Sequence, residues 1–422
     1  MVGTLMLRLP SATHAQFLPL EDALFTATSA VTVTGLIVCD TPVDFTRFGQ
    51  IVILVLIQLG GLGFMSFSTL IILLFGRPLS LTDRSLIISD FTTGSARNIR
   101  SIVIRIFLFT ITFETVGAVV LYFQFSHLEG SRRLFSAVFH AVSAFCNAGF
   151  SLFSNSLRDF TASPGINLTF IVLILAGGIG FVVLKDIAGC LSFRNRVVCR
   201  ISLHSKVVLT VSGLLVLAGF LVIWLEELSN PTKSLAGGSR LLASLFQSIT
   251  ARTAGFNTIE MNILSPASLF MIMILMFIGA SPGSTGGGVK TTSVGMVFAY
   301  IRSLLRGRDR VSLHYRRISG KNIEKALLVI VLSLGVVVIS FLLLASFQPG
   351  LPFQDLLFET ISAFGTVGLS LGVTPQMSLP SKIVIMITML IGRVGPLTLL
   401  IALSRKESRA EFQYPEESIM IG

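Results

Sequence analysis

Four glycines stand in short segments that resemble one another and lie far apart along the chain. Each segment has a Phe, then Ser or Thr four residues later, then Ala, and reaches its glycine nine or ten residues after the Phe. The segments read LFTATSAVTVTGL, VFHAVSAFCNAGF, LFQSITARTAGFN and LFETISAFGTVGLS. Their glycines are Gly35, Gly149, Gly255 and Gly368, separated by 114, 106 and 113 residues. Self-similarity at such a period predicts structural repeats.

Glycine suits a strand that must bring its backbone close to an ion. It lacks a Cβ atom, so the strand can adopt unusual dihedral angles and turn its carbonyls inward. Rings of carbonyl oxygens replace the hydration shell of a cation such as potassium. The short helix before each glycine would point its negative C-terminal end at the ion. The predicted filter residues are Thr32, Val33, Thr34 and Gly35; Cys146, Asn147, Ala148 and Gly149; Thr253, Ala254 and Gly255; and Thr366, Val367 and Gly368.

The elements that carry these strands must sit in a lipid bilayer. The mean hydropathy is +0.84 and charged residues make up 13% of the chain, against about 25% in soluble domains. Long apolar runs cover residues 46–76, 166–193, 203–225, 267–301, 326–347 and 381–404. Since a span needs roughly 20 apolar residues, we predict an all-α polytopic membrane protein. The segments before the glycines are too short to cross, so they must re-enter, buried in protein or lining a watery cavity.

The basic residues set the orientation. Most lysines and arginines fall in four short segments that the spans place on one side, and the positive-inside bias makes that side cytoplasmic. The densest segment, residues 302–325, is a candidate partner surface. On the opposite side acidic residues outnumber basic ones, which favours cations at the mouth. The net charge of +11 therefore indicates membrane orientation rather than nucleic-acid binding.

The segments TVTGL, CNAGF, RTAGF and GTVGLS resemble the single-glycine filters of the Trk/Ktr/HKT superfamily of potassium transporters. The short cytoplasmic loops and the ending YPEESIMIG are most similar to membrane subunits of bacterial Ktr systems. The resemblance implies potassium uptake through a pore in the bacterial plasma membrane, by a homodimer in contact with membrane lipid. It also implies a cytoplasmic ring of regulatory subunits whose RCK domains bind ATP or ADP. Sodium ions often activate such systems.

The expected architecture is four membrane–pore-loop–membrane repeats around one pore, with pseudo-fourfold symmetry. We place the repeats at residues 1–78, 79–200, 201–310 and 311–422. Only MVGTLMLRLP precedes the first pore segment, about half a span at 1.5 Å per residue. The first outer helix is therefore expected to be incomplete.

The inner span of the third repeat contains GASPGSTGGGVKTT, residues 279–292. Glycine and proline disfavour a helix interior, and Val289 between Gly288 and Lys290 argues against a phosphate-binding loop. The family resemblance implies a gate formed by residues 279–290 below the filter, although a flexible kink remains an alternative. The candidate gate residues are Gly279, Gly283, Gly286, Gly287, Gly288 and Lys290, whose ammonium would oppose cations or anchor the loop.

Two arginines lie at membrane depth. Arg393, in LIGRVGPL, costs about 2.5–3.5 kcal/mol near the bilayer centre, so it should face protein or water. We expect it in the cavity beneath the filter, as a barrier or a partner of the gate loop, with a packing salt bridge as the alternative. Arg252 should lie behind the filter and pair with Glu359 or Glu114. Asn147 and Asn257 either brace the strands by hydrogen bonds or simply pack.

A coupled symporter and a membrane enzyme are the two alternatives to a passive pore. A sodium- or proton-coupled symporter would use inverted repeats and broken helices at the midplane, whereas the four segments here run in the same direction. A membrane enzyme would need clustered nucleophiles, acids or metal ligands in the spans, and carboxylates such as Glu114 stand isolated rather than in such a cluster. The sequence thus favours passive, selective permeation with no catalytic site.

Overall fold

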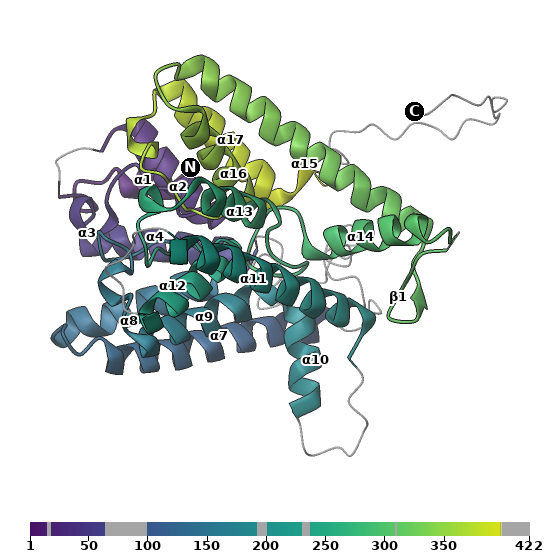
Figure 1. The fold of residues 1–422 in the computed structure, drawn as a ribbon. Helices are drawn as coiled ribbons and strands as arrows, with labels where there is room; N and C mark the ends of the chain where they lie inside the picture. The colour runs from purple at the N-terminus through teal and green to yellow at the C-terminus, as the bar shows by residue number, and fades with distance from the viewer. Residues whose placement is uncertain are drawn as a thin grey trace.

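The computed structural model describes residues 1–14, 18–63, 99–191, 201–229, 237–308, 310–396 and 398, which fold almost entirely into helices (Figure 1). Within these residues, three helices are long and apolar enough to cross a membrane: α7 (Ile99–Gln124), α11 (Leu203–Ser229) and α15 (Gly320–Phe347). The 28 residues of α15 extend about 42 Å at 1.5 Å per residue. That length exceeds the ~30 Å hydrocarbon core of a bilayer. The predicted all-α polytopic class is confirmed.

Each repeat has a short helix and an inner helix, which in the second, third and fourth repeats follow a long outer helix. The short helices are α2 (Leu20–Thr32), α8 (Gly130–Phe145), α12 (Gly237–Thr250) and α16 (Phe353–Gly365). The inner helices are α4 (Arg47–Gly61), α9 (Pro164–Ile179), α13 (Pro266–Phe277) and α17 (Leu379–Val394). In the first repeat, α1 (Val2–Leu7) stands before the short helix and packs against α2 and α4.

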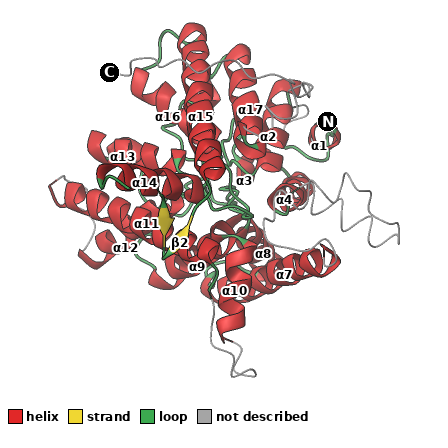
Figure 2. Ribbon diagram, turned by 90° about the vertical axis from the view of Figure 1, so that its right-hand side faces the viewer, coloured by secondary structure: helices red, strands yellow, loops and turns green. Residues whose placement is uncertain are grey.

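The repeats close into a ring through contacts between successive members. Each inner helix packs against the short helix of the next repeat: α4 against α8, α9 against α12, α13 against α16, and α17 against α2. Figure 2 shows the four groups of helices arranged around a centre that is filled by loops. This cyclic order brings the four glycine segments to one place.

The Phe shared by the four segments fixes each short helix in the interior. Phe25, Phe139, Phe246 and Phe358 are all fully buried. Burying one such side chain contributes roughly 1.5–3 kcal/mol. The sequence pattern that identified the repeats therefore marks their packing anchors.

Two of the apolar runs are interrupted; the break in 267–301 is the one expected from its glycines and proline, whereas 166–193 was expected to be continuous. The run 166–193 divides into α9 and α10 (Phe181–Leu191), which meet at an angle of 109°. The break falls at Gly180, whose φ of +97° is accessible to a residue without Cβ. The run 267–301 is broken by residues 278–290, which connect α13 to α14 (Thr291–Leu305).

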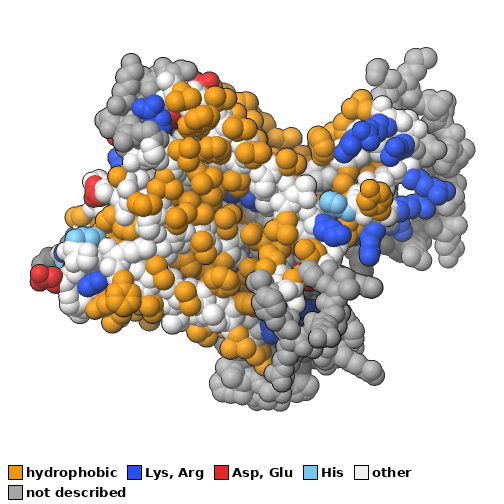
Figure 3. Space-filling view, turned by 60° about the horizontal axis from the view of Figure 1, so that its bottom comes forward, with side chains coloured by type: hydrophobic (Ala, Val, Ile, Leu, Met, Phe, Trp, Pro, Cys, Tyr) orange, Lys and Arg blue, Asp and Glu red, His pale blue; other side chains and the backbone are white. Residues whose placement is uncertain are grey.

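Small elements complete the two ends of the molecule. One end carries α3 (Thr41–Asp44) and three 3₁₀ turns, η2 (Arg158–Phe160), η3 (Met261–Ile263) and η4 (Thr374–Gln376). At the other end, β1 (Ser312–Leu313) pairs antiparallel with β2 (Arg316–Arg317) in a hairpin after α14. Figure 3 shows apolar side chains over the body and basic ones gathered on the lobe at the right, where Figure 1 places the hairpin. This separation fits a membrane protein whose basic end faces the cytoplasm.

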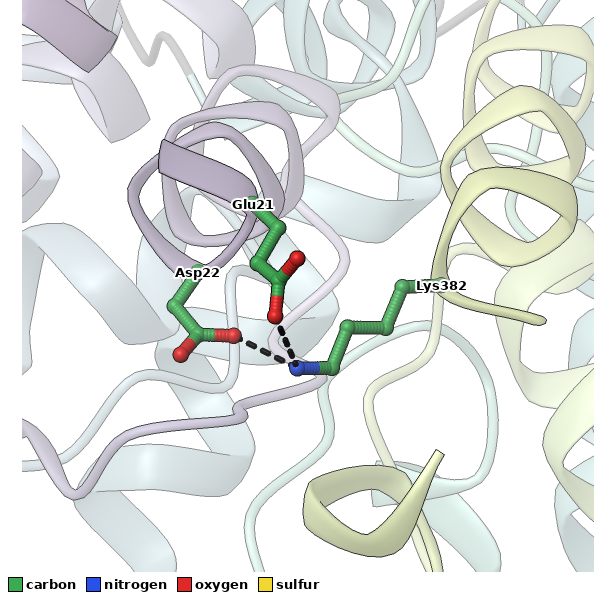
Figure 4. A network of polar contacts seen from close by, with 3 residues as sticks. All are labelled: Glu21, Asp22 and Lys382. Carbon is green, nitrogen blue, oxygen red and sulfur yellow. Dashed lines mark hydrogen bonds and ion pairs between the residues drawn. The ribbon is translucent and has the colours of Figure 1, made fainter. Parts of the chain in front are cut away.

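A buried ion pair joins the first repeat to the last. The Lys382 Nζ atom on α17 lies 2.7 Å from Asp22 Oδ1 and 3.7 Å from Glu21 Oε1, both at the start of α2 (Figure 4). The Lys382 side chain is 9% exposed and that of Asp22 is 18% exposed. This contact closes the ring between segments about 360 residues apart.

Candidate functional site

The four glycines form a contiguous ring at the centre of the molecule. A Cβ atom placed on Gly149 would lie 3.2 Å from the Cα of Gly255, and one on Gly255 would lie 3.3 Å from the Cα of Gly368. The same atom on Gly368 would lie 2.9 Å from the Cα of Gly35, and on Gly35 it would lie 3.0 Å from the Cα of Gly149. The cyclic order of the glycines therefore matches that of the helices. We call these four residues the glycine ring.

Each ring glycine also faces the carbonyl oxygen that precedes its neighbour. A Cβ on Gly149 would lie 3.1 Å from the Ala254 oxygen, and the other three glycines would clash with the equivalent carbonyls. Those carbonyls belong to Thr34, Ala148 and Val367. Any side chain in the ring would therefore strike the backbone of the next strand.

The four strands share one pattern of backbone dihedral angles. The ring glycines have φ of +89°, +70°, +76° and +89° in chain order. The residue two positions before each glycine is also left-handed: Val33, Asn147, Thr253 and Thr366 have φ between +50° and +77°. This conformation is costly for β-branched residues and persists where the surroundings impose it, often at functional sites. Gly255 keeps the pattern although its segment is one residue shorter.

The hydroxyl residue of the repeated pattern ties each strand to its short helix. Ser29 and Ser362 accept hydrogen bonds from the backbone N–H of Gly35 and Gly368, both at 3.1 Å. Ser143 and Thr250 instead donate to the carbonyl one residue beyond their glycine, at 2.7 and 2.8 Å. The Ser or Thr in the sequence pattern thus has a structural role that spacing alone did not reveal.

Several buried carbonyl groups of these strands have no hydrogen-bond donor. Across the part of the chain that the structure describes, no hydrogen-bond donor reaches the carbonyl oxygens of the ring glycines or of the two residues before each of them. Most of these residues are fully buried. Since buried carbonyls are normally paired, a cluster of them is chemically suited to a cation. Thr32, the last residue of α2, and Cys146, directly after α8, lie at helix ends before this stretch.

The ring opens outward into a cavity of about 340 Å³. Its charged lining residues are Asp40, Arg158 and Glu260, so the mouth carries one net negative charge. The Arg158 Nη1 and Glu260 Oε2 atoms lie 3.7 Å apart, with both side chains more than a third exposed. Such an exposed pair contributes little to stability, but the net negative mouth favours cations.

Cys39, in the first outer loop, lies near two carboxylates. Burial, and after it the nearby carboxylates of Asp22 and Asp44, raise the pKa of the Cys39 thiol to about 12, against the opposing effect of Lys382. The thiol therefore stays protonated at neutral pH. Because the thiolate is the reactive form, this residue is not a nucleophile.

The loop 279–290 lies directly beneath the ring. The Gly287 N–H donates to the Thr366 hydroxyl at 2.9 Å, and Thr285 donates through its hydroxyl to the Phe145 carbonyl at 3.2 Å. The loop also bonds to Gly177 and Gly178 of α9, at 3.2 and 3.1 Å. It thus touches the ends of two short helices and an inner helix.

The predicted gate glycines take different places in this loop. Gly279 packs against Gly287, whose carbonyl accepts from the Ala280 N–H at 3.3 Å, while the Gly288 N–H donates to Gly392 at 3.3 Å. Gly283 lies at the α9–α10 bend and accepts from the Phe181 N–H at 3.0 Å. The Lys290 ammonium donates to the Gly286 carbonyl at 2.7 Å, which is an anchoring contact within the loop.

Arg393, in the fourth repeat, links the loop 279–290 of the third repeat to the inner helix of the first. Its guanidinium donates to the Thr285 carbonyl in the loop and to the Gly60 carbonyl at the end of α4. It also reaches the Gly61 carbonyl at 3.5 Å. These are neutral acceptors, and within the described residues Arg393 makes no ion pair. The charge is thus held below the ring and joins the loop to the first repeat.

The predicted partner of Arg252 is wrong. Its Nη2 atom donates to the Ser212 hydroxyl at 3.1 Å. Glu359 accepts instead from hydroxyl groups of its own repeat, and Glu114 from Gln58 and Cys146. A partner on the neighbouring outer helix α11 lies closer than either carboxylate, which local sequence does not encode.

The two asparagines brace the strands differently. The Asn147 amide lies 3.4 Å from the Thr253 hydroxyl of the next repeat. Asn257 acts through its backbone, which bonds to the Ser156 hydroxyl at 3.1 Å and to the Leu157 N–H at 2.9 Å. Both link the second and third repeats.

Sequence reasoning missed a second repeated signal at the ends of the inner helices. GGLG at 60–63, GGIG at 177–180 and GRVG at 392–395 align with one another. Their last glycines, Gly63, Gly180 and Gly395, have φ of +78°, +97° and +89°. Their first glycines, at 60, 177 and 392, leave no room for a Cβ against the end of the short helix of their repeat. In this register Arg393 stands where two other repeats have glycine.

Comparison with known proteins covers nearly the whole chain. The TrkH family, described as cation transport protein, matches residues 2–414. The chain is 39% identical over 426 residues to the Ktr system potassium uptake protein B of Bacillus subtilis, with 100% of this chain and 94% of that protein covered. It is 38% identical over 411 residues to the potassium/sodium uptake protein NtpJ of Enterococcus hirae, with coverage of 95% and 89%. The crystal structure of the potassium transporter TrkH from Vibrio parahaemolyticus shares the fold, with a TM-score of 0.71, 20% identity and coverage of 92% of this chain and 79% of that one.

Proposed function

The chain belongs to the TrkH family of cation transport proteins, and from that premise we propose that potassium ions pass selectively through its glycine ring. It is a multi-pass plasma-membrane protein and a potassium uptake transporter of the Ktr/TrkH family, not an enzyme. The finer proposal concerns how the ion is selected. Carbonyl oxygens of the strands at 32–35, 146–149, 253–255 and 366–368 replace the water around the ion.

One observation carries this proposal. Four strands from different parts of the chain meet glycine to glycine, and their buried carbonyls are left without donors in the described residues. A ring of uncharged oxygens binds a monovalent cation without a carboxylate. This arrangement supports a filter more directly than close helix packing, which needs no unpaired carbonyls.

We further propose that the loop 279–290 gates the pathway. In the position described here it lies under the ring, anchored by Thr366 and by Arg393. Its glycines allow displacement, and the guanidinium of Arg393 raises the energy of a cation at this depth. Opening would release the loop from these contacts and move the charge aside.

The partners are proposed from the relatives. The Ktr-system name of the relatives supports a regulatory subunit on the cytoplasmic side, and we propose a homodimer on a ring of RCK subunits that bind ATP or ADP. Sodium as an activator is proposed from the same resemblance. The repeat boundaries near residues 78, 200 and 310 are also proposed, and the first two lie outside the described residues.

Growth of a bacterium that lacks its own potassium uptake systems tests the function. Expression of the chain with a Ktr regulatory subunit should restore growth at low potassium. Expression without that subunit should restore it less. No rescue by the full-length, membrane-inserted chain in the presence of the subunit would contradict the proposal.

A coupled symporter is the second candidate, favoured by the potassium/sodium name of the Enterococcus relative. The two mechanisms differ in what drives the ion. Passive permeation predicts rubidium flux into proteoliposomes under a potassium gradient alone. Flux that requires a sodium or proton gradient would favour the symporter.

A further inference from the structure

A buried polar side chain follows the shared Phe on every short helix. These residues are Thr26, His140, Gln247 and Glu359, and each is at most 2% exposed. Full burial of a carboxylate or an imidazole is rare without compensating hydrogen bonds. His140 and Glu359 therefore need hydrogen-bond partners in the interior.

His140 holds the loop just beyond the second ring glycine. Its Nδ1 atom lies 2.7 Å from the Ser136 carbonyl, and its Nε2 atom accepts from the Leu152 N–H at 3.2 Å. These partners place the proton on Nδ1 and make Nε2 an acceptor. The Ser151 hydroxyl, 3.1 Å from Nε2, therefore donates to it.

Glu359 makes the same arrangement in the fourth repeat. Its carboxylate accepts from the Ser370 hydroxyl and, at 2.9 Å, from the Thr374 hydroxyl. Ser370 and Ser151 occupy the same position, two residues after their ring glycine. The oxygen of each accepts a backbone N–H two residues further on, from Gly372 at 2.8 Å and from Phe153 at 3.0 Å.

The two serines stand across the mouth from each other. The glycine ring follows the order 35, 149, 255 and 368, so the second and fourth strands are opposite. Both serines line the outer cavity, where the equivalent positions in the other repeats are Ile37 and Asn257. Hydroxyl groups thus stand at two opposite positions of the mouth, and the other two positions carry an apolar side chain and an amide.

The hydrogen bonds of Ser151 and Ser370 determine which donor or acceptor site of each hydroxyl is left for the cavity. A serine hydroxyl has one donor and two acceptor sites. The donor is committed to His140 or Glu359 and one acceptor site to a backbone N–H. The remaining lone pair is the only group of the hydroxyl left for an ion in the cavity, and it attracts cations.

We propose that His140 and Glu359 are positioning residues that orient the Ser151 and Ser370 hydroxyls into a pair of cation-attracting oxygens above the glycine ring. This inference rests on the proposed function. The serines form an outer binding site through which ions approach the filter, and the two buried side chains act only through them.

The test measures rubidium uptake by the purified chain in proteoliposomes, over a range of rubidium concentrations. Ser370→Ala and Glu359→Gln should each raise the concentration for half-maximal uptake by roughly fivefold, the size expected when one oriented polar contact is lost. Maximal uptake and thermal stability should change little. Ser151→Ala should act like Ser370→Ala. Ser346→Ala, which removes a hydroxyl bonded within α15, is the matched control.

The double variant that combines Glu359→Gln with Ser370→Ala shows whether Glu359 acts through Ser370. If it acts through Ser370, then Glu359→Gln adds nothing to Ser370→Ala, because the effects of coupled residues are not additive. Additive effects, or an unchanged half-maximal concentration in both serine variants, would overturn the inference. If Glu359→Gln does not fold, the two serine variants still decide. Failure of the wild-type chain to take up rubidium would instead contradict the proposed function.

Discussion

At the scale of single residues, Gly35 is constrained by conformation and by space together. Its φ of +89° is unfavourable for any side chain, and a Cβ there would meet the Ala148 carbonyl and lie 3.0 Å from Gly149. The same two constraints hold around the ring. Glycine is required here because the strands approach one another backbone to backbone.

Replacing Gly35 with Ser should therefore weaken the preference for potassium over sodium. The added Cβ and hydroxyl displace the neighbouring carbonyl, so the fit to one ion size is lost. We expect the rubidium-to-sodium flux ratio to fall by about tenfold or more, which corresponds to about 1.4 kcal/mol. Gly335→Ser, where a Cβ meets no atom within 4 Å, should leave the ratio unchanged. An unaltered ratio in Gly35→Ser would count against a filter at this residue.

Replacing Arg393 with Gln should increase rubidium flux. The change removes the positive charge beneath the ring and the bridge between the loop and α4. A rise on the order of tenfold is expected if the charge contributes about 1.4 kcal/mol to the barrier. Flux is measured in proteoliposomes and normalised to protein. Arg132→Gln, an exposed arginine at the start of α8, serves as the control. Unchanged flux together with poor expression would indicate a packing role.

Some of these residues could be identified from the sequence and others could not. The ring glycines were found because a local pattern repeats four times. The partner of Arg252 was not, since Ser212 lies 40 positions away and no local pattern encodes that contact. The glycines at the inner helix ends escaped notice because glycine in an apolar helix is ordinarily a packing residue.

At the scale of secondary structure, interruption of the inner helices is what makes room for the site. The four inner helices end at Gly61, Ile179, Phe277 and Val394, and the loop 279–290 occupies the space below the ring. The broken third span was expected from its glycines and proline. The 109° bend after α9 was not, because the single residue Gly180 gives a weak local signal.

Thr366 connects the strand of the fourth repeat to this loop. Thr366→Val keeps the shape of the side chain but removes the hydroxyl that accepts from the Gly287 N–H. A buried donor without a partner costs about 1–3 kcal/mol, so the loop position beneath the ring should be populated less.

The expected result is a severalfold higher rubidium flux with little change in the rubidium-to-sodium ratio. Thr360→Val removes a hydroxyl that bonds only within α16, to the Leu356 carbonyl at 2.7 Å, and should leave the flux as it was. Equal fluxes in Thr366→Val and wild type would argue that the loop does not gate.

At the scale of the whole molecule, the ring of repeats must close between its two ends. The helices α17 and α2 pack together, and Lys382 bonds to Asp22 between them. The pseudo-fourfold order was predictable from the repeated pattern. The ion pair that closes the ring could not be predicted, because local sequence gives no signal for a contact between residues about 360 positions apart.

Lys382→Met should lower the stability of the closed ring. It leaves Asp22 mostly buried beside an apolar group, and breaking such a pair costs up to about 3 kcal/mol. We expect a lower unfolding temperature in detergent, partly restored by adding Asp22→Asn. Glu260→Gln, which breaks the exposed pair with Arg158, should change stability by less than about 1 kcal/mol. Equal effects of the two variants would contradict a closing role for Lys382.

The most direct measurement is anomalous diffraction from crystals of the protein grown in rubidium. A rubidium peak should lie on the axis enclosed by Gly35, Gly149, Gly255 and Gly368, with backbone carbonyl oxygens as its ligands. The peak should weaken when potassium replaces rubidium and persist in excess sodium. Rubidium bound only outside this ring, or displaced equally well by sodium, would contradict selection by the four glycine strands.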